Sequence, residues 1–251
     1  MSTPTYERGD LVWHTFASRE QLADDLADHL TASFNAAIDQ RGQASVALSG
    51  GSTPLPLFKA LADQSIGWPQ VLATLVDERW VPPSHELSNQ QFITTHLLNS
   101  LSDPLEFVPL FHGGDSAEAD AEAAVAQFAA LRKSGQGARR FDAVVLGMGL
   151  DGHTASFFPD APNVGTLISY DDQQLVHTCL SPVSQVTRVT WSLAALLDTH
   201  HLVLHITGQD KRDLFERATE APAVTVDEMM QWPIRAMAYQ SRIPLHIYYA
   251  D

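Results

Sequence analysis

The chain has 251 residues, of which 45% are hydrophobic and 18% charged, a composition typical of a globular protein. Its 30 acidic and 15 basic residues give a formal net charge of −15, which disfavours nucleic acid and anionic membranes as partners. A single cysteine, Cys179, excludes an internal disulfide and a cysteine-based metal cluster. No apolar run approaches the roughly 18–20 residues of a membrane span. The polar start lacks the pattern of a secretory signal, so we expect a cytoplasmic protein.

The first half of the chain alternates short apolar runs with helical patterns. The clearest helix begins near Ser18, which has capping-box spacing to Gln21, and apolar residues then recur every fourth position from Leu22 to Ile38. Strands are predicted over residues 11–14, 45–49, 71–77 and 141–147, and helices over 18–42, 54–62, 88–98 and 116–133.

The second half continues the alternation. Further strands are predicted over residues 175–180, 188–192, 201–207 and 244–250, and a helix over 210–218. Continuous apolar strands separated by helices predict a mostly parallel sheet covered on both faces. Because no linker or composition change divides the chain, we expect one α/β domain over residues 1–251, with a small α+β subdomain as an option around 160–200.

The segment LSGGSTP lies between the first buried strand and a helix. Gly50 and Gly51 allow close backbone approach, while Ser49, Ser52 and Thr53 add hydroxyl groups. Free N–H groups at the following helix start favour an anion. Neither a Walker A loop nor a G-x-G-x-x-G pattern is present, so a single phosphate fits better than a nucleotide. The alternative interpretation is a tight turn with a helix cap.

Charged residues follow the strand over 71–77 and flank two later strands. Asp77 and Arg79, in VDERWVP, lie where the ligand-binding loops of α/β sheets gather, although a solvated charged turn is an alternative. Arg188 opens RVTWS, and Lys211 follows HITGQD. Since the chain has few cations, both are candidates to bind a phosphate, with an ordinary surface charge as the alternative for each.

The segment GMGLDGH places an acid and a histidine after a buried strand. Gly147 and Gly149 let the chain leave the strand sharply, so that Asp151, Gly152 and His153 lie at its carboxyl end. A histidine accepts a proton near neutral pH, and an adjacent carboxylate can orient it. Residues two apart share a face only in extended backbone, so contact between the two side chains stays open. The alternative is a surface turn.

Together, LSGGSTP, VDERWVP with SNQQF, and GMGLDGHTASFFP resemble the motifs of the 6-phosphogluconolactonase family, in that family's order. The likeness covers roughly residues 10–250, and RVT at Arg188 and GQDK ending at Lys211 match later phosphate-binding positions. The related glucosamine-6-phosphate deaminases share a similar Asp-Gly-His segment, but HTASFFPD departs from their signature. After about residue 215, TVDEMMQWPIRAM lacks features that map onto the family.

The resemblance implies a doubly wound α/β fold, hydrolysis of 6-phosphogluconolactone in the pentose phosphate pathway, and no cofactor or metal. It implies that His153 is the general base for water and that Asp151 orients its ring. Further residues that it implies at the substrate or its phosphate are Ser49, Gly50, Gly51, Ser52, Thr53, Asp77, Arg79, Arg188 and Lys211. The expected partner is a sugar-phosphate lactone, with no nucleic acid or membrane, and the chain is expected to be a monomer or a small homo-oligomer.

Two other functions stay open at this point. One is a deaminase-like isomerase that acts on an amino-sugar phosphate with Asp77 as the base, and that releases ammonia. The other is a non-catalytic sugar-phosphate sensor, although a sensor needs only the phosphate-binding groups and not Asp151 and His153. Oligomeric state, lactone ring size and the donor to the oxyanion are not readable from the sequence.

Overall fold

Seven parallel strands form the main sheet of the protein, seen here in a computed structural model that describes residues 4–132, 140–182 and 184–251. In spatial order the strands are β2 (Leu11–Thr15), β12 (Leu245–Ala250), β10 (Thr199–Thr207), β7 (Phe141–Leu146), β3 (Ala44–Leu48), β4 (Val71–Leu75) and β6 (Glu106–Val108). Every pairing between neighbours is parallel, as predicted from the continuous apolar runs.

The order of the strands reverses beside β3. From β3 the chain continues to β4 and β6 on one side, and it then returns to β7, β10 and β12 on the other side. In open α/β sheets, ligands bind outside the carboxyl ends of the strands at such a reversal. The loops that follow β3 and β7 carry LSGGSTP and GMGLDGH, so the topology places both segments at this position.

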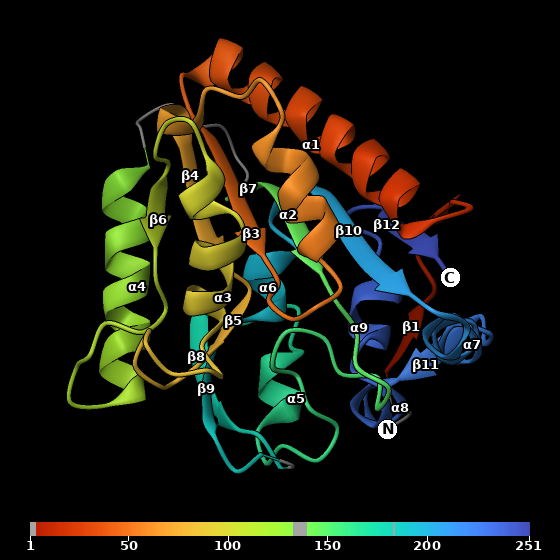
Figure 1. Ribbon diagram of the computed structural model, residues 1–251. Helices are drawn as coiled ribbons and strands as arrows, with labels where there is room; N and C mark the ends of the chain where they lie inside the picture. Colours follow the sequence, from red (N-terminus) through yellow and green to blue (C-terminus); the bar gives the residue numbers. More distant parts are fainter. Residues whose placement is uncertain (1–3, 133–139, 183) are drawn as a thin grey trace.

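Helix α1 (Arg19–Arg41) lies along the sheet, where it contacts β3, β7 and β12 and packs against α2 (Leu55–Ala62) (Figure 1). It begins as predicted, because the Ser18 hydroxyl accepts a hydrogen bond from the Gln21 N–H. It ends at Gly42, whose φ of 75° is left-handed and whose N–H donates to the carbonyl of Ile38. The predicted apolar face from Leu22 to Phe34 is buried.

The other α-helices in the described ranges are shorter. They are α3 (Asn89–His96), α4 (Ala117–Leu131), α5 (Val164–Leu167), α6 (Leu193–Leu196), α7 (Gln209–Ala218), α8 (Val226–Gln231) and α9 (Arg235–Ala238). Helix α4 contacts β6 and also two strands outside the main sheet. The predicted helix over 116–133 matches α4, although Lys133 lies outside the described residues.

The strands predicted over 175–180 and 188–192 are strands, but they do not join the parallel sheet. They form β8 (Val176–Leu180) and β9 (Thr187–Trp191), which pair antiparallel with each other. The segment Asp77–Arg79 is a separate strand, β5, antiparallel to β9, rather than the end of the preceding strand. The subdomain expected around 160–200 thus takes one strand from far earlier in the chain.

A two-stranded antiparallel ribbon, β1 (Thr5–Glu7) with β11 (Ala223–Thr225), lies near α8 and was not predicted. Buried apolar side chains of the main sheet, the three-stranded sheet and the helices form one continuous core. In the described ranges, no helix combines the length and apolar character needed to cross a membrane.

Candidate active site

A cleft of about 600 Å³ opens at the carboxyl ends of β3, β7 and β10 and beside β5. Every residue predicted to be catalytic or substrate-binding lines it: Ser49, Gly50, Gly51, Ser52, Thr53, Asp77, Arg79, Asp151, His153, Arg188 and Lys211. The structure therefore brings together side chains from segments that are far apart in the sequence. The loops for which an ordinary turn was the alternative thus face one common space.

Asp151 and His153 contact each other directly. Oδ1 of Asp151 lies 2.5 Å from Nδ1 of His153 and also accepts a hydrogen bond from the backbone N–H of His153 at 3.1 Å. Burial opposes the charge of Asp151, but the hydrogen bonds and charge of His153 outweigh it, so the pKa of Asp151 is lowered. A carboxylate at Nδ1 favours the tautomer with its proton there, which leaves Nε2 as the proton acceptor.

Two glycines permit this contact. A Cβ atom at Gly149 would lie 2.2 Å from the His153 ring, and Gly152 has a left-handed φ of 80°. The turn is closed by hydrogen bonds from the Gly149 N–H to the His153 carbonyl, at 2.9 Å, and from the Gly152 N–H to the Gly149 carbonyl, at 3.1 Å. The short backbone path that results turns the histidine back onto Asp151.

The segment after α8 braces the same turn. Trp232 lies so close that a Cβ atom at Gly152 would come within 2.9 Å of its ring, and the Ile234 N–H donates to the Gly152 carbonyl at 2.9 Å. This segment carries no motif that predicts a function from the sequence. The one sequence feature that hints at this contact is the glycine of Asp-Gly-His. A residue with a left-handed φ that packs against an indole ring has no room for a side chain.

The loop after β3 lies opposite the histidine turn. The Ser49 hydroxyl accepts a hydrogen bond from the Gly147 N–H at 3.1 Å, which joins the loops that follow β3 and β7. Gly50 packs against Asn89, since a Cβ atom there would lie 2.2 Å from its side-chain oxygen, and Gly51 has a left-handed φ of 89°. Helix α2 follows with no side-chain cap. The Leu55 N–H donates to the Ser52 carbonyl at 3.3 Å and Pro56 has no N–H, which leaves the Leu57 N–H as the candidate donor to an anion in the first turn.

Asp77 and Arg188 lie together because β5 pairs with β9. Asp77 is buried and accepts a hydrogen bond from the Ser156 hydroxyl at 2.5 Å, and Nη1 of Arg188 lies 4.0 Å from the Asp77 carboxylate. Arg79 is directly opposite Arg188 in the register and donates to the carbonyl of Leu87. The Nε atoms of both arginines have no hydrogen-bond partner in the described structure.

Glu78, between two of the predicted residues, faces away from this chemistry. It is fully buried and accepts hydrogen bonds from the N–H groups of Arg79, Asn89 and Gln90 and from the Ser88 hydroxyl. Burial raises its pKa despite these donors. Its carboxylate therefore holds the start of α3 against β5, which keeps Arg79 and Asn89 at the cleft.

Lys211 reaches the cleft from the first turn of α7. Its pKa is lowered by burial and then by the charge of Arg19. Several residues that line the cleft were not predicted as site residues: Asn89, Phe158, Ser181, Ser184 and His205. Phe158 packs on the His153 ring, with centroids 4.8 Å apart, and its ring lies 5.5 Å from the Arg188 guanidinium carbon.

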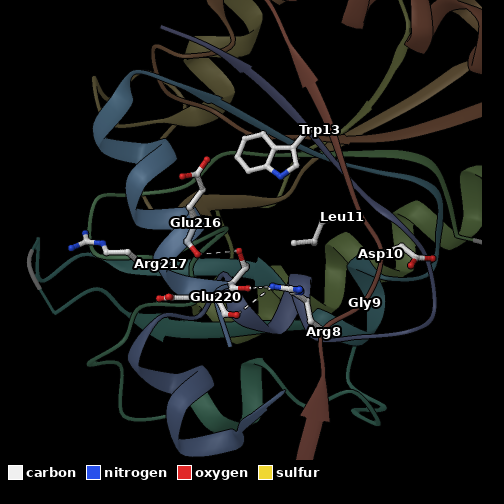
Figure 2. A pocket seen from close by; sticks show the side chains of 9 residues that line it. Arg8, Gly9, Asp10, Leu11, Trp13, Glu216, Arg217 and Glu220 are labelled. Atoms are coloured by element: carbon white, nitrogen blue, oxygen red, sulfur yellow. Dashed lines mark hydrogen bonds between the residues drawn. The ribbon is translucent and has the colours of Figure 1, made fainter. Parts of the chain in front are cut away.

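A second hollow, of about 650 Å³, lies between residues 8–13 and the end of α7 (Figure 2). The Arg8 guanidinium donates there to the carbonyls of Thr219 and Glu220. None of the predicted site residues lines this hollow, and its acidic side chains outnumber its basic ones. Although it is slightly larger, it therefore does not suit an anionic substrate as the cleft does. Within the described ranges, no cluster of three or more His, Cys, Asp or Glu residues is arranged to hold a metal ion.

A cleft at the point where the strand order reverses is the ligand site of doubly wound α/β proteins, and this chain has that architecture. Residues 17–243 match the family described as glucosamine-6-phosphate isomerases/6-phosphogluconolactonase. The chain belongs to this family.

Individual relatives agree with this assignment. The chain is 39% identical to a 6-phosphogluconolactonase of Rhizobium meliloti over 94% of this chain and 97% of the relative. A crystal structure of a 6-phosphogluconolactonase from Shewanella baltica superposes with a TM-score of 0.88 at 33% identity, covering 98% of this chain and 100% of the other. A monomeric glucosamine-6-phosphate deaminase shares the fold alone, with a TM-score of 0.72 at 16% identity over 94% and 97% of the two chains.

Proposed function

We propose that the chain is a 6-phosphogluconolactonase, which hydrolyses 6-phospho-D-glucono-1,5-lactone to 6-phospho-D-gluconate in the oxidative pentose phosphate pathway. The observation that carries the proposal is the direct pairing of Asp151 with His153 in the cleft. It is joined by the 39% identity to a 6-phosphogluconolactonase over nearly the whole chain. A sensor needs no such pair, and the relative's activity is a hydrolysis.

In the proposed reaction, Nε2 of His153 takes a proton from a water molecule as the oxygen of that water bonds to the lactone carbonyl carbon. Asp151, at Nδ1, holds the ring in orientation and stabilises the imidazolium that forms. The tetrahedral intermediate then collapses, and the bond from the carbonyl carbon to the ring oxygen breaks. The ring oxygen takes the proton back from His153, and the new carboxylic acid releases one proton to solvent.

The phosphate of the substrate is proposed to bind at the loop from Ser49 to Thr53, with Lys211 and Arg188 as its cations and with Asp77 and Arg79 near the substrate. The support is that these groups line one cleft with the His–Asp pair. A phosphate bound far from the reacting carbon fixes the orientation of the lactone, and such orientation lowers the activation barrier.

Proton release from freshly prepared 6-phosphogluconolactone, corrected for spontaneous hydrolysis, tests the activity. We expect rapid catalysed release with the phosphorylated lactone and much slower release with unphosphorylated gluconolactone. Ammonia release from glucosamine 6-phosphate, in place of lactone hydrolysis, would identify the isomerase. Absence of turnover with either substrate would point to the sensor.

Thermal unfolding in EDTA, with inorganic phosphate titrated at constant ionic strength, tests the phosphate-binding groups. A ligand that binds only the folded chain raises the Tm as its concentration passes the Kd. We expect a rise for the wild type that is weaker in Lys211→Ala. Equal rises in both proteins would indicate a general salt effect and would remove Lys211 from the site.

We also propose that the protein folds as one domain and works in the cytoplasm, as a monomer or a small homo-oligomer. The continuous core supports the first point. Cell fractionation and sedimentation of the purified protein test the other two, and partial proteolysis tests the first, since one domain resists cleavage into stable halves.

A further inference from the structure

His205 lines the cleft from β10 and has no part in the reaction proposed above. Along β10 its side chain lies on the same face of the sheet as that of His201, because strand side chains alternate. Leu204 pairs with Leu146 of β7, so His205 lies level with Gly147. The N–H of Gly147 donates to Ser49, which places His205 beside the proposed phosphate loop.

The imidazole of His205 is buried without a partner. The residue is 3% exposed, and its Nδ1 atom has no hydrogen-bond partner in the described structure. Buried polar atoms in native proteins are nearly always paired. Among the buried side-chain nitrogens of the described residues that lack a partner, the others at the cleft belong to Arg79 and Arg188, which are proposed to contact substrate. Unpaired buried polar atoms also occur away from the cleft, in Arg41, Gln90 and Trp191. In His205 the unpaired nitrogen belongs to a residue that lines the cleft, where a bound ligand can supply the missing polar group.

The surroundings of His205 determine its protonation state, and therefore which hydrogen bonds its ring can make. Burial, and then the positive charge of Lys211, lower the pKa of His205 to about 4. Tyr248 of β12 lies in register beside it, and burial raises the pKa of Tyr248 to about 12. Both rings are therefore neutral at pH 7, and His205 has one N–H to donate. Gly208, just beyond, is the N-cap residue of α7 and provides no side-chain cap.

We propose that His205 is a substrate-binding residue, whose ring N–H donates a hydrogen bond to a phosphate oxygen between the Ser49–Thr53 loop and Lys211. The inference rests on the proposed binding of a sugar phosphate in this cleft. It adds a neutral donor to the cationic groups, so that the phosphate is bound by directed hydrogen bonds as well as by charge.

Variants at position 205 test this with inorganic phosphate as the probe and calorimetry as the readout, at about pH 7.5 and constant ionic strength. His205→Leu removes the donor, and we expect its Kd for phosphate to rise about tenfold or more, the usual effect of losing a hydrogen bond to a charged group. His205→Asn and His205→Gln place an amide N–H near the two ring nitrogens, and one of them should return the Kd to within about threefold of the wild type.

His201→Leu is the matched control, because it lies on the same strand and the same face but does not line the cleft. It should keep the wild-type Kd. In ¹⁵N-labelled wild type, the ring nitrogen signals of His205 should shift as phosphate is added while those of His201 stay in place. This titration needs no variant, so it remains decisive if His205→Leu folds poorly.

An unchanged Kd in folded His205→Leu, or ring signals of His205 that ignore phosphate, would overturn the inference. Lactone hydrolysis by a wild type that does not bind phosphate would also overturn it, while leaving the proposed function intact. Phosphate binding that depends on His205 in a protein that does not hydrolyse the lactone would support the inference and overturn the function.

Discussion

Two histidines of the described structure pair with a carboxylate, and they lie in different regions. His153 and Asp151 belong to the turn after β7, where their side chains are 32% and 44% exposed. His177 of β8 pairs with Asp172, and these side chains are only 10% and 12% exposed. The first pair lines the cleft, whereas the second does not.

The comparison shows that a His–Asp pair by itself does not mark a catalytic site. A general base has to reach a water molecule and a substrate. Of the two pairs, Asp151 and His153 lie at the cleft where we propose that the substrate binds. The pair at β8 is nearly sealed from solvent, so its hydrogen bond serves to join β8 to the segment before it. The two pairs thus differ in burial and in position, and we propose a catalytic role for the pair at the cleft alone.

A second contrast comes from histidines that have no carboxylate partner. His14, His29, His201 and His246 form a cluster between α1 and the sheet, with ring nitrogens of His14 and His246 at 3.1 Å and of His29 and His201 at 3.3 Å. Burial, followed by the charge of neighbouring histidines, lowers the pKa of His201 to about 4, and burial likewise lowers the pKa of His29 and His246. The rings of His29, His201 and His246 are therefore suited to stay neutral.

The largest effect is expected from His153→Ala, which should lower kcat by about two to four orders of magnitude, the range for loss of a general base. The matched variant His177→Ala should keep kcat within about twofold but lower stability by about 1–3 kcal/mol, because it leaves a nearly buried carboxylate unpaired. Proton-release kinetics and denaturant unfolding of both proteins measure this. Similar losses of kcat in the two variants would abolish the distinction between the pairs.

Gly152→Ala tests whether the turn positions His153. The new Cβ atom would come within 2.9 Å of Trp232 at a left-handed φ, so we expect kcat to fall by about 10- to 100-fold as the imidazole is displaced. Gly113→Ala is the control: its φ is also left-handed, at 75°, but the nearest atom is 3.8 Å away and outside the cleft. It should cost about 1 kcal/mol of stability with kcat unchanged. A fully active Gly152→Ala would refute the positioning.

A moderate effect is expected on acid stability. Below about pH 6.5 the unfolded chain binds protons that the folded cluster excludes, so the free energy of unfolding should fall between about pH 6.5 and 4. His201→Asn removes one histidine whose pKa is lowered by folding. Allowing for solvent screening at this half-buried site, we expect the fall in the free energy of unfolding to be about 1–2 kcal/mol smaller in this variant. Urea unfolding at a series of pH values measures the slope. An identical slope in wild type and variant would show that His201 titrates normally in the fold.

The smallest effect is expected from His200→Ala, one residue away. His200 is exposed on the opposite face of β10. The free energy of unfolding of the variant should therefore match that of the wild type within about 0.5 kcal/mol at each pH. The same unfolding series provides the measurement. If His200→Ala flattens the pH dependence of stability as much as His201→Asn does, that dependence would come from charge at the amino end of β10 in general, and not from the cluster.

Local physics made much of the molecule readable from its sequence. Apolar runs identified six of the seven strands of the parallel sheet, all but the short edge strand β6. The four-residue repeat from Leu22, with its serine and glycine caps, identified α1. The three motif loops were also recognisable as candidates, because glycines and polar groups directly after buried strands are typical of ligand sites. An ordinary turn was the alternative for each loop until the resemblance of all three to the family's motifs was considered. The parallel order then gathers those loops at one edge, so the candidate residues of the cleft could be named in advance.

Pairings between distant segments were decided by the tertiary structure alone. Residues 77–79 form their own strand because β9 offers them an antiparallel edge, and no local pattern reveals that partner. Asp151 reaches His153 through a left-handed Gly152 packed under Trp232, so the contact depends on a segment some 80 residues later in the chain. From the sequence, His205 is predicted only to be one more residue of an apolar strand. Only the packing around it leaves its ring buried, unpaired and beside Lys211, because burial and hydrogen bonding are properties of the assembled fold.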